Sequence, residues 1–296
     1  MKNKNVYRGL LALTAAVVLT SCGGTDTEEP KNIIVEEVDT LDNEVNALEV
    51  EYSVPTPNEL FEIVKLQGGE QKVGLVNSLD NKDNYVETKE KALNFGIYSA
   101  DLAYMSCFGV GTEFLMYMKV IEEMGDELGI SGAFDSDLMD RIENNEGDSD
   151  SLFSISNETY YDSYLYLEEN GKGMELSLIM GAGYIESLYI ICQLTDGYNE
   201  SDAIIEKIGD QKLVLENLME FLASYQDEPD VADLTNDLMS LQEVFEISMD
   251  FEESGTNVDN TDGKLVLSGG GSFAMNEQAL IDITAKVTEM RENIIK

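Results

Sequence analysis

The sequence contains no histidine and no tryptophan. Without histidine the chain cannot build a Ser-His-Asp or Cys-His catalytic arrangement, nor a zinc or ferritin-like metal site that uses histidine. Any catalyst would have to work with carboxylates, tyrosine, lysine or cysteine alone. We therefore expect a protein that is not an enzyme.

Basic residues are scarce, with 18 Lys and Arg against 59 Asp and Glu in 296 residues. Three of them, Lys2, Lys4 and Arg8, lie in the first 21 residues, which hold no acidic residue. The rest of the chain has 15 basic against 59 acidic residues and a formal charge of −44. Such a field repels nucleic acid and anionic lipid headgroups, keeps the protein dispersed, and favours cations and basic proteins as partners.

The N-terminal segment has the plan of an export signal. Its basic residues precede an apolar stretch from Leu10 to Thr20, which is too short to span a bilayer as a mature helix. The stretch closes on Leu19-Thr20-Ser21-Cys22, which resembles the lipobox of bacterial lipoproteins. That resemblance covers the first 22 residues and implies cleavage before Cys22 and attachment of lipid (palmitate among the acyl chains) to Cys22. The alternative is an ordinary secretory signal that ends near a cysteine.

The residues after Cys22 indicate where the lipoprotein is sent. Gly23-Gly24, with no Asp next to the cysteine, resembles lipoproteins that are passed on to the outer membrane of Gram-negative bacteria. The acidic run of Asp26, Glu28 and Glu29 resembles the surface-export tag of Bacteroidota lipoproteins. The resemblance implies a lipid-anchored protein of the outer membrane and leaves both the periplasmic and the cell-surface face open.

One stretch of twelve residues occurs twice, at an offset of 85. Both copies carry Gly, a carboxylate, Tyr and Cys at the same spacing: Gly96, Asp101, Tyr104 and Cys107, then Gly181, Glu186, Tyr189 and Cys192. At 100° per residue, Gly, Tyr and Cys fall on one helical stripe with the carboxylate at its edge. Three weaker matches follow in the same order at offsets of 80 to 84, so the spacing predicts a duplicated block of helices.

The sequence therefore predicts an all-α fold, a duplicated helical bundle with flanking helices. The expected divisions are a signal peptide (1–21), an acidic tether (22–53) and a helical domain (54–296) with pseudo-repeats 86–171 and 172–255 and a C-terminal cap 256–296. The expected helices of the two repeats are 86–108, 112–125, 134–145 and 151–170, then 173–194, 199–209, 211–226 and 231–253.

Shorter signals mark the ends of these helices. Glycines are expected as helix C-caps at Gly125, Gly171, Gly209 and Gly255. Flanking helices are expected at 57–67, where Thr56, Pro57 and Glu59 form a capping box, and at 275–295. A brief extended segment is expected at 264–267.

The most suggestive candidate site is the carboxylate pair Asp101 and Glu186, with Tyr104 and Tyr189 one turn further along. If a pseudo-twofold axis relates the two helices, the carboxylates approach each other, and like charges that lie close raise one pKa or recruit a cation. An all-oxygen pocket would suit a hard cation such as Ca²⁺, although the sequence identifies no particular metal. The other interpretation is that each carboxylate is hydrogen-bonded and fixes how the helices pack.

The equivalent cysteines Cys107 and Cys192 also allow two interpretations. In an exported protein they could form a disulfide, and pseudo-symmetric positions near an axis face one another. They could equally be two buried free thiols, because cysteine behaves as a small apolar residue in helical cores. Gly96 and Gly181 are expected to let the two helices approach closely.

The architecture is similar in outline to imelysin-like lipoproteins, which are duplicated helical bundles tied to iron uptake. Their Gly-x-His-x-x-Glu signature is absent because the chain has no histidine, so that function is not implied. We expect an acidic helical lipoprotein, a non-catalytic binding or accessory subunit of an envelope complex with a protein partner, no nucleic acid and no cofactor beyond the lipid. The alternative is a cation-binding lipoprotein that uses the paired carboxylates.

Overall fold

The computed structural model describes residues 56–67, 71–72, 74–134, 136–252, 257–261, 264–268 and 272–296. Val50–Lys296 forms one compact unit. The expected signal peptide, the lipidation site Cys22 and the acidic tether lie outside the described residues and stay predictions.

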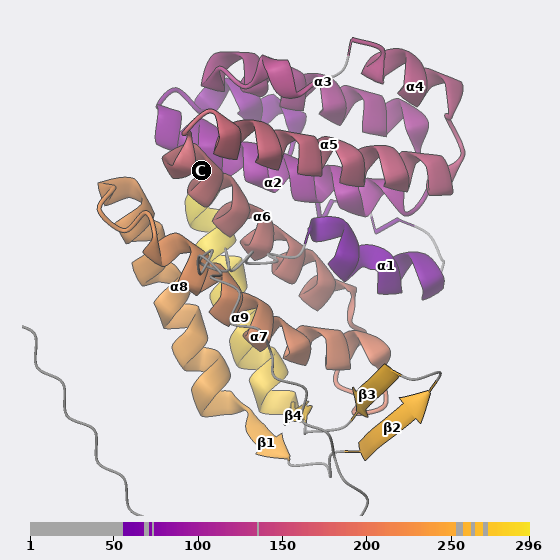
Figure 1. Cartoon of the computed structure of the whole chain (residues 1–296), viewed down its shortest axis with the longest axis vertical. Helices are drawn as coiled ribbons and strands as arrows, with labels where there is room; N and C mark the ends of the chain where they lie inside the picture. The colour runs from indigo at the N-terminus through magenta and orange to yellow at the C-terminus, as the bar shows by residue number, and fades with distance from the viewer. Residues whose placement is uncertain are drawn as a thin grey trace, which may run out of the picture. The chain divides into compact units, whose positions relative to one another are not determined.

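The compact unit is a helical bundle, which confirms the predicted all-α class (Figure 1). Its α-helices are α1 (Pro57–Gln67), α2 (Thr88–Ser106), α3 (Gly111–Leu128), α4 (Leu138–Asn144), α5 (Ser149–Glu169), α6 (Gly173–Leu194), α7 (Ala203–Ala223), α8 (Pro229–Ser248) and α9 (Glu277–Ile294). Two short 3₁₀ helices, η1 (Leu79–Asn84) and η2 (Ser131–Ala133), lie in the connections. Between α8 and α9 the chain forms two small antiparallel ladders, in which β1 (Asp250–Glu252) pairs with β4 (Ser272–Ala274) and β2 (Asn257–Thr261) pairs with β3 (Lys264–Ser268).

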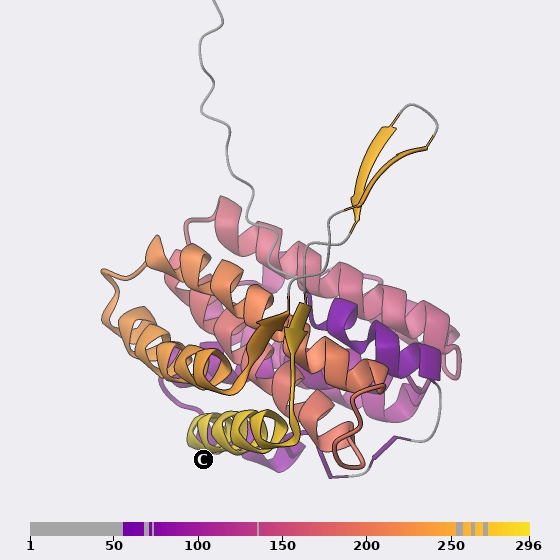
Figure 2. The ribbon, with the colours of Figure 1, turned by 90° about the horizontal axis from the view of Figure 1, so that it is seen from below.

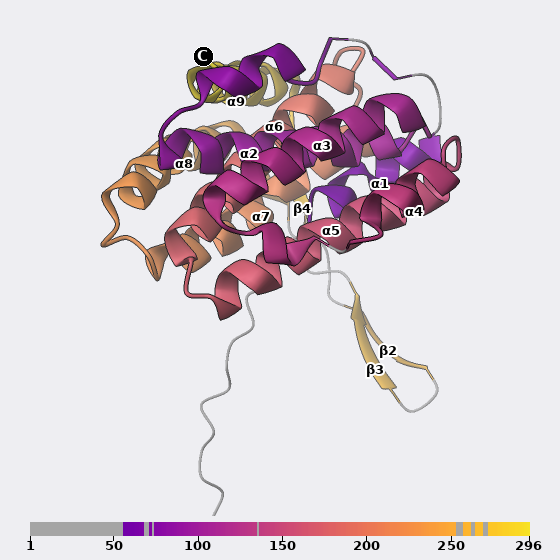
Figure 3. The same cartoon turned by 90° about the horizontal axis from the view of Figure 1, so that it is seen from above.

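Helices α2 and α6 are the centre of the bundle. They pack side by side along much of their length, with α1, α3 and α5 against α2 and with α7, α8 and α9 against α6 (Figures 1 and 3). A helix that is covered on every side needs apolar residues all round. Among the described helices, α6 is the one long and apolar enough to cross a membrane, but 89% of its apolar stretch is buried inside this domain, as in the core helix of a bundle.

Gly96 is the point of closest approach between α2 and α6. A Cβ atom there would lie 2.2 Å from the carbonyl oxygen of Ile179 and 3.0 Å from the amide nitrogen of Gly183. Further along the same two helices, Asp101 meets Glu186. Because both contact points advance in the same direction along both helices, α2 and α6 run parallel, with equivalent positions of the two copies nearly in register.

The expectation that Gly96 lets α2 and α6 approach closely is therefore confirmed. The same expectation for Gly181 is wrong, because this glycine faces another helix. A Cβ atom on Gly181 would lie 2.5 Å from Cδ2 of Leu234 on α8, so this glycine makes room for α8. Equivalent positions in the two copies thus face different neighbours.

The first block contains the four helices that were expected, α2 to α5, with ends shifted by a few residues. The second block differs, because the two helices expected at 199–209 and 211–226 form the single helix α7. Gly209 lies buried inside α7 rather than at a C-cap, since one internal glycine costs a helix only about 1 kcal/mol. Superposition of residues 86–171 on 172–255 stays a prediction.

The other predicted caps have mixed outcomes. Gly171 adopts the left-handed conformation after α5, with φ of 67°, as expected. Gly125 lies inside α3, so its predicted role as a C-cap is wrong. The helix continues to Leu128 and is capped by Gly129, which has a φ of 70° and donates its amide to the carbonyls of Asp126 and Gly125. Gly255 lies outside the described residues.

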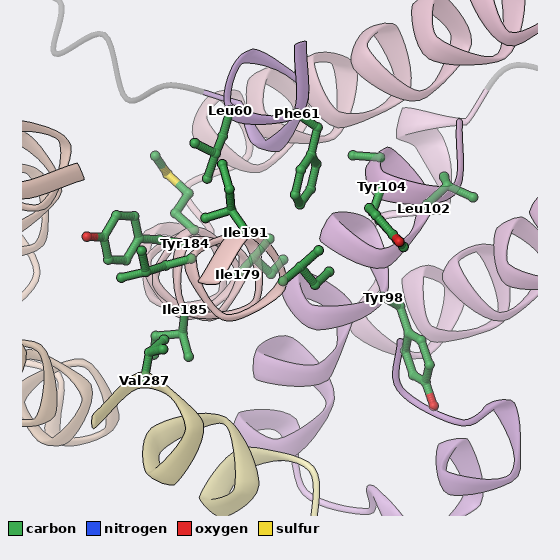
Figure 4. Close-up of a cluster of buried hydrophobic side chains, with 14 of the residues drawn as sticks. Leu60, Phe61, Tyr98, Leu102, Tyr104, Ile179, Tyr184, Ile185, Ile191 and Val287 are labelled. Atoms are coloured by element: carbon green, nitrogen blue, oxygen red, sulfur yellow. The ribbon is translucent and has the colours of Figure 1, made fainter. Parts of the chain in front are cut away.

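The flanking helices cover the two sides of the central pair. Helix α1 begins at Pro57, as predicted, and α9 runs along α6 and α8 (Figure 2). Leu280, Ile283, Val287 and Met290 of α9 are buried, and Ile294 lies partly buried against the same core. Buried side chains from α1, α2, α6 and α9 meet in one apolar core (Figure 4). The extended segment expected at 264–267 lies within β3.

Candidate functional site

Asp101 of α2 and Glu186 of α6 meet inside the core. Both side chains are fully buried, with 0% exposure, and the carboxyls lie close enough for the charge of Glu186 to raise the pKa of Asp101. One oxygen of each, Asp101 Oδ1 and Glu186 Oε1, has no hydrogen-bond partner in the described part of the chain. Two ionised carboxylates can only accept hydrogen bonds, so a proton on one of them is needed before the two carboxyls can bond to each other.

Arg291 of α9 supplies the positive charge beside the pair. Its Nε donates to Glu186 Oε2 at 2.6 Å, and an Nη donates to the carbonyl oxygen of Leu75 at 2.9 Å. The guanidinium carbon lies 4.3 Å from the centre of the Tyr189 ring, which is cation–π geometry. With one shared proton, the two acids and the single base form a cluster of zero net charge.

A short segment before η1 closes the cluster. The amide of Asn77 donates to Asp101 Oδ2 at 2.9 Å, and its own carbonyl accepts from the Tyr117 hydroxyl at 2.6 Å. The Asn77 side chain donates to the Tyr85 hydroxyl at 3.0 Å. The next carbonyl, of Ser78, accepts from the Tyr98 hydroxyl at 2.8 Å. Residues 75–78 are therefore tied to α2, α3 and α9 through backbone groups, and they cover the carboxyl pair.

The surroundings decide which carboxyl carries the proton. Burial, and next the negative charge of Glu186, raise the pKa of Asp101 well above its usual range. Burial also raises the pKa of Glu186, but the charge and hydrogen bond of Arg291 oppose that rise. We therefore assign the proton to Asp101 and the negative charge to Glu186. Removal from water raises the pKa of the nearby phenols of Tyr85 and Tyr117, so they stay neutral hydrogen-bond donors.

The structure brings together three of the four residues that the sequence grouped. Asp101 and Glu186 lie close together, and Tyr189 joins them through Arg291. Tyr104 is bonded elsewhere: its hydroxyl accepts from the Lys72 amide at 2.9 Å, and its ring packs against Phe61 and Phe108.

Sequence reasoning missed Arg291 and Asn77. A signal for Arg291 was present, because it lies four residues after Val287 and three before Ile294, which is the apolar stripe of α9. A basic residue on such a stripe needs a buried acidic partner. Asn77 gives no comparable signal, because it contacts Asp101 through its backbone amide.

Cys107 and Cys192 are both buried free thiols, so the disulfide weighed as an alternative is not formed. The Cys107 sulfur lies 3.7 Å from the Phe61 carbonyl on the α1 side of the pair, whereas Cys192 lies next to Thr284 on the α9 side. The two sulfurs therefore point to different neighbours. Burial raises the pKa of both thiols to about 12, which makes them unreactive.

In the described residues, no group of three or more Cys, Asp or Glu side chains is arranged to hold a metal ion. Comparison of the chain with protein-family models, with curated proteins and with solved structures finds no match.

Proposed function

We propose that this protein is an acidic helical lipoprotein, anchored in the outer membrane, that acts as a non-catalytic binding or accessory subunit of an envelope complex. The observation that carries the non-catalytic part is the burial of the Asp101–Glu186–Arg291 cluster. Both carboxyls have 0% exposure, and the cluster balances its own charge. A catalytic carboxyl must reach its substrate within hydrogen-bond distance, and these carboxyls reach only protein groups.

The anchor is supported by the leader sequence that ends at Cys22. Each buried CH₂ of an acyl chain contributes about 0.8 kcal/mol, so several chains hold the polypeptide durably at the membrane while it stays in water. The formal charge of −44 after the leader disperses the domain and attracts basic surfaces. These properties suit a tethered subunit that recruits a partner by charge.

The alternative, cation binding at Asp101 and Glu186, has weaker support. The position beside Glu186 is already taken by the Arg291 guanidinium, at 2.6 Å from the carboxylate oxygen. A divalent cation would have to displace both that guanidinium and the proton on Asp101. Calorimetric titration with Ca²⁺, Mg²⁺ and Fe ions tests it, and binding that is lost in both Asp101→Asn and Glu186→Gln would favour this alternative.

The anchor is tested by labelling cells that express the full chain with palmitate and then separating membranes. We expect the wild-type chain to be labelled and to sediment with the outer membrane. Cys22→Ser should lose the label, whereas the matched control Cys107→Ser, which changes a buried thiol, should keep it. An unlabelled mature protein in the soluble fraction would contradict the anchor.

The binding role is tested by crosslinking in intact cells, followed by purification of the crosslinked species. We expect a defined envelope protein to crosslink to the wild-type chain and to be lost with Cys22→Ser, which releases the domain from the membrane. A chain that crosslinks to nothing, in cells where it is acylated and membrane-bound, would contradict the accessory role and leave the anchor standing.

A further inference from the structure

A cleft of about 170 Å³ opens between α1, α5, α6 and α7, apart from the Asp101 cluster. Its floor comes from α6, and its walls come from α1, α5 and α7. The lining includes Met180, Tyr184 and Ser187 on the floor, with Leu60, Tyr160 and Val214 among the residues of the walls. Figure 4 shows Leu60 of α1 and Tyr184 of α6 on the same side of the central pair.

The inner part of the cleft is suited to an apolar group. The Tyr184 hydroxyl donates to the Gln211 carbonyl at 3.0 Å, and the Ser187 hydroxyl donates to the Gly183 carbonyl at 2.7 Å. These hydroxyls already form hydrogen bonds within the protein, so a ligand need not supply a polar partner for them. The Tyr184 ring and the Met180 side chain remain as an apolar contact surface. A cavity of about 150 Å³ accommodates a benzene molecule, so this cleft has room for one aromatic ring or a short aliphatic chain.

The mouth of the cleft carries negative charge. Asp210 pairs with Lys207 at 3.6 Å, whereas Glu59 is exposed and makes no ion pair within the described residues. Glu59 and Tyr160 both line this cleft, and the charge of Glu59 contributes to raising the pKa of Tyr160, after burial and the neighbouring Tyr164. The two acids and one base leave one net negative charge, next to an aromatic ring.

We infer that this cleft binds a small organic cation, an ammonium group attached to an aromatic or short aliphatic body. The body fills the space over Met180 and Tyr184, and the ammonium lies between the Glu59 carboxylate and the face of Tyr160. An ammonium over an aromatic face and beside a carboxylate gains from both contacts. This assignment rests on the proposed binding function, for which it names a ligand class, but not on the lipid anchor.

The probe is 2-phenylethylamine, which is titrated by calorimetry at pH 7 and 0.15 M salt into the acyl-free chain that begins at Val50, the start of the compact unit. Two probes of the same size, neutral 2-phenylethanol and anionic 3-phenylpropionate, separate the effect of charge from that of shape. We expect the amine to bind most tightly and the anion least. No binding of the amine, or equal binding of all three probes, would overturn the proposal.

Two pairs of variants locate the site. Glu59→Gln should weaken amine binding by about 3- to 10-fold, whereas Glu62→Gln, an exposed change on the same helix, should leave it unchanged. Val214→Phe should fill the cleft and abolish binding, whereas the exposed Leu213→Phe should not. Thermal unfolding of each variant shows that it is folded.

An equal loss of amine affinity in Glu59→Gln and Glu62→Gln would mean that the amine is attracted by the overall negative charge of the protein. That result would overturn the proposed site. Palmitate labelling of Cys22 is unaffected by any of these results, so failure of the cleft and failure of the proposed anchor are distinguishable.

Discussion

Replacing Asp101 with asparagine should stabilise the domain at neutral pH and change it little near pH 4. Asparagine has nearly the same shape as a protonated aspartic acid. Its Oδ1 can accept from the Asn77 amide, as the native carboxyl does, and its Nδ2 can donate to Glu186 in the way that a protonated Asp101 would. The substitution removes only the need to take up a proton on folding.

The size of the effect follows from proton linkage. The pKa of Asp101 is raised in the folded protein above the ordinary value of 3.8 that it has when unfolded. The stability that this group contributes is therefore complete below about pH 4 and is lost as the pH rises through the folded pKa. In that interval the loss is about 1.4 kcal/mol per pH unit, and asparagine does not incur it. The difference in unfolding free energy between Asp101→Asn and wild type should grow at that rate.

The assay is urea unfolding of the acyl-free chain from Val50, followed by far-ultraviolet circular dichroism between pH 4 and pH 8. Carboxyls away from the pair titrate equally in the two proteins, so the difference reports on Asp101 and its neighbour Glu186. Asp237→Asn, an exposed change on α8, is the matched control and should differ from wild type by a nearly constant amount. A constant difference for Asp101→Asn too would refute the assignment of the proton.

Three further predictions follow from the same contacts. Arg291→Met should lower the free energy of unfolding by about 3–5 kcal/mol at pH 7, because it leaves the Glu186 carboxylate buried and unpaired. The loss should be smaller at pH 5, where a proton on Glu186 can replace the guanidinium. Urea unfolding at both pH values checks this. Gly96→Ala should cost more than about 2 kcal/mol by thermal unfolding, since its Cβ would lie 2.2 Å from a carbonyl oxygen, whereas Gly183→Ala, with its nearest contact at 3.5 Å, should cost under about 1 kcal/mol. Cys107 and Cys192 should not react with a thiol reagent in the native domain and should both react in urea; a native thiol that reacts rapidly would contradict their burial.

The central part of the fold was predictable because its signals are periodic. The repeated Gly, carboxylate, Tyr and Cys positions mark α2 and α6, and the expectation that Asp101 and Glu186 approach each other agrees with the effect of the Glu186 charge on the pKa of Asp101. Helical period also places α1 and α9 to within a few residues. Periodicity reports which face of a helix is buried, and in α2 and α6 that information was sufficient.

Other features depend on contacts that the sequence does not encode locally. Gly125 and Gly209 were predicted to end helices, but both lie buried inside helices. At Gly125 the reason is visible, because a Cβ atom there would lie 2.5 Å from the Phe134 ring, so the close packing of this ring requires a glycine. Arg291 and Glu186 lie 105 residues apart in the sequence, so their contact depends on how α9 packs against α6. The segment around Asn77 contacts Asp101 and Tyr117 through its backbone amide and carbonyl, and the sequence does not indicate which backbone groups make such contacts.

The most direct test of the sealed and charge-balanced cluster is carboxyl ¹³C NMR of the acyl-free chain from Val50, with Asp101 and Glu186 assigned through the spectra of Asp101→Asn and Glu186→Gln. We predict that at pH 7 the Asp101 carboxyl has the chemical shift of a protonated acid and Glu186 that of a carboxylate. An Asp101 signal that titrates near its ordinary value of 3.8 would contradict it.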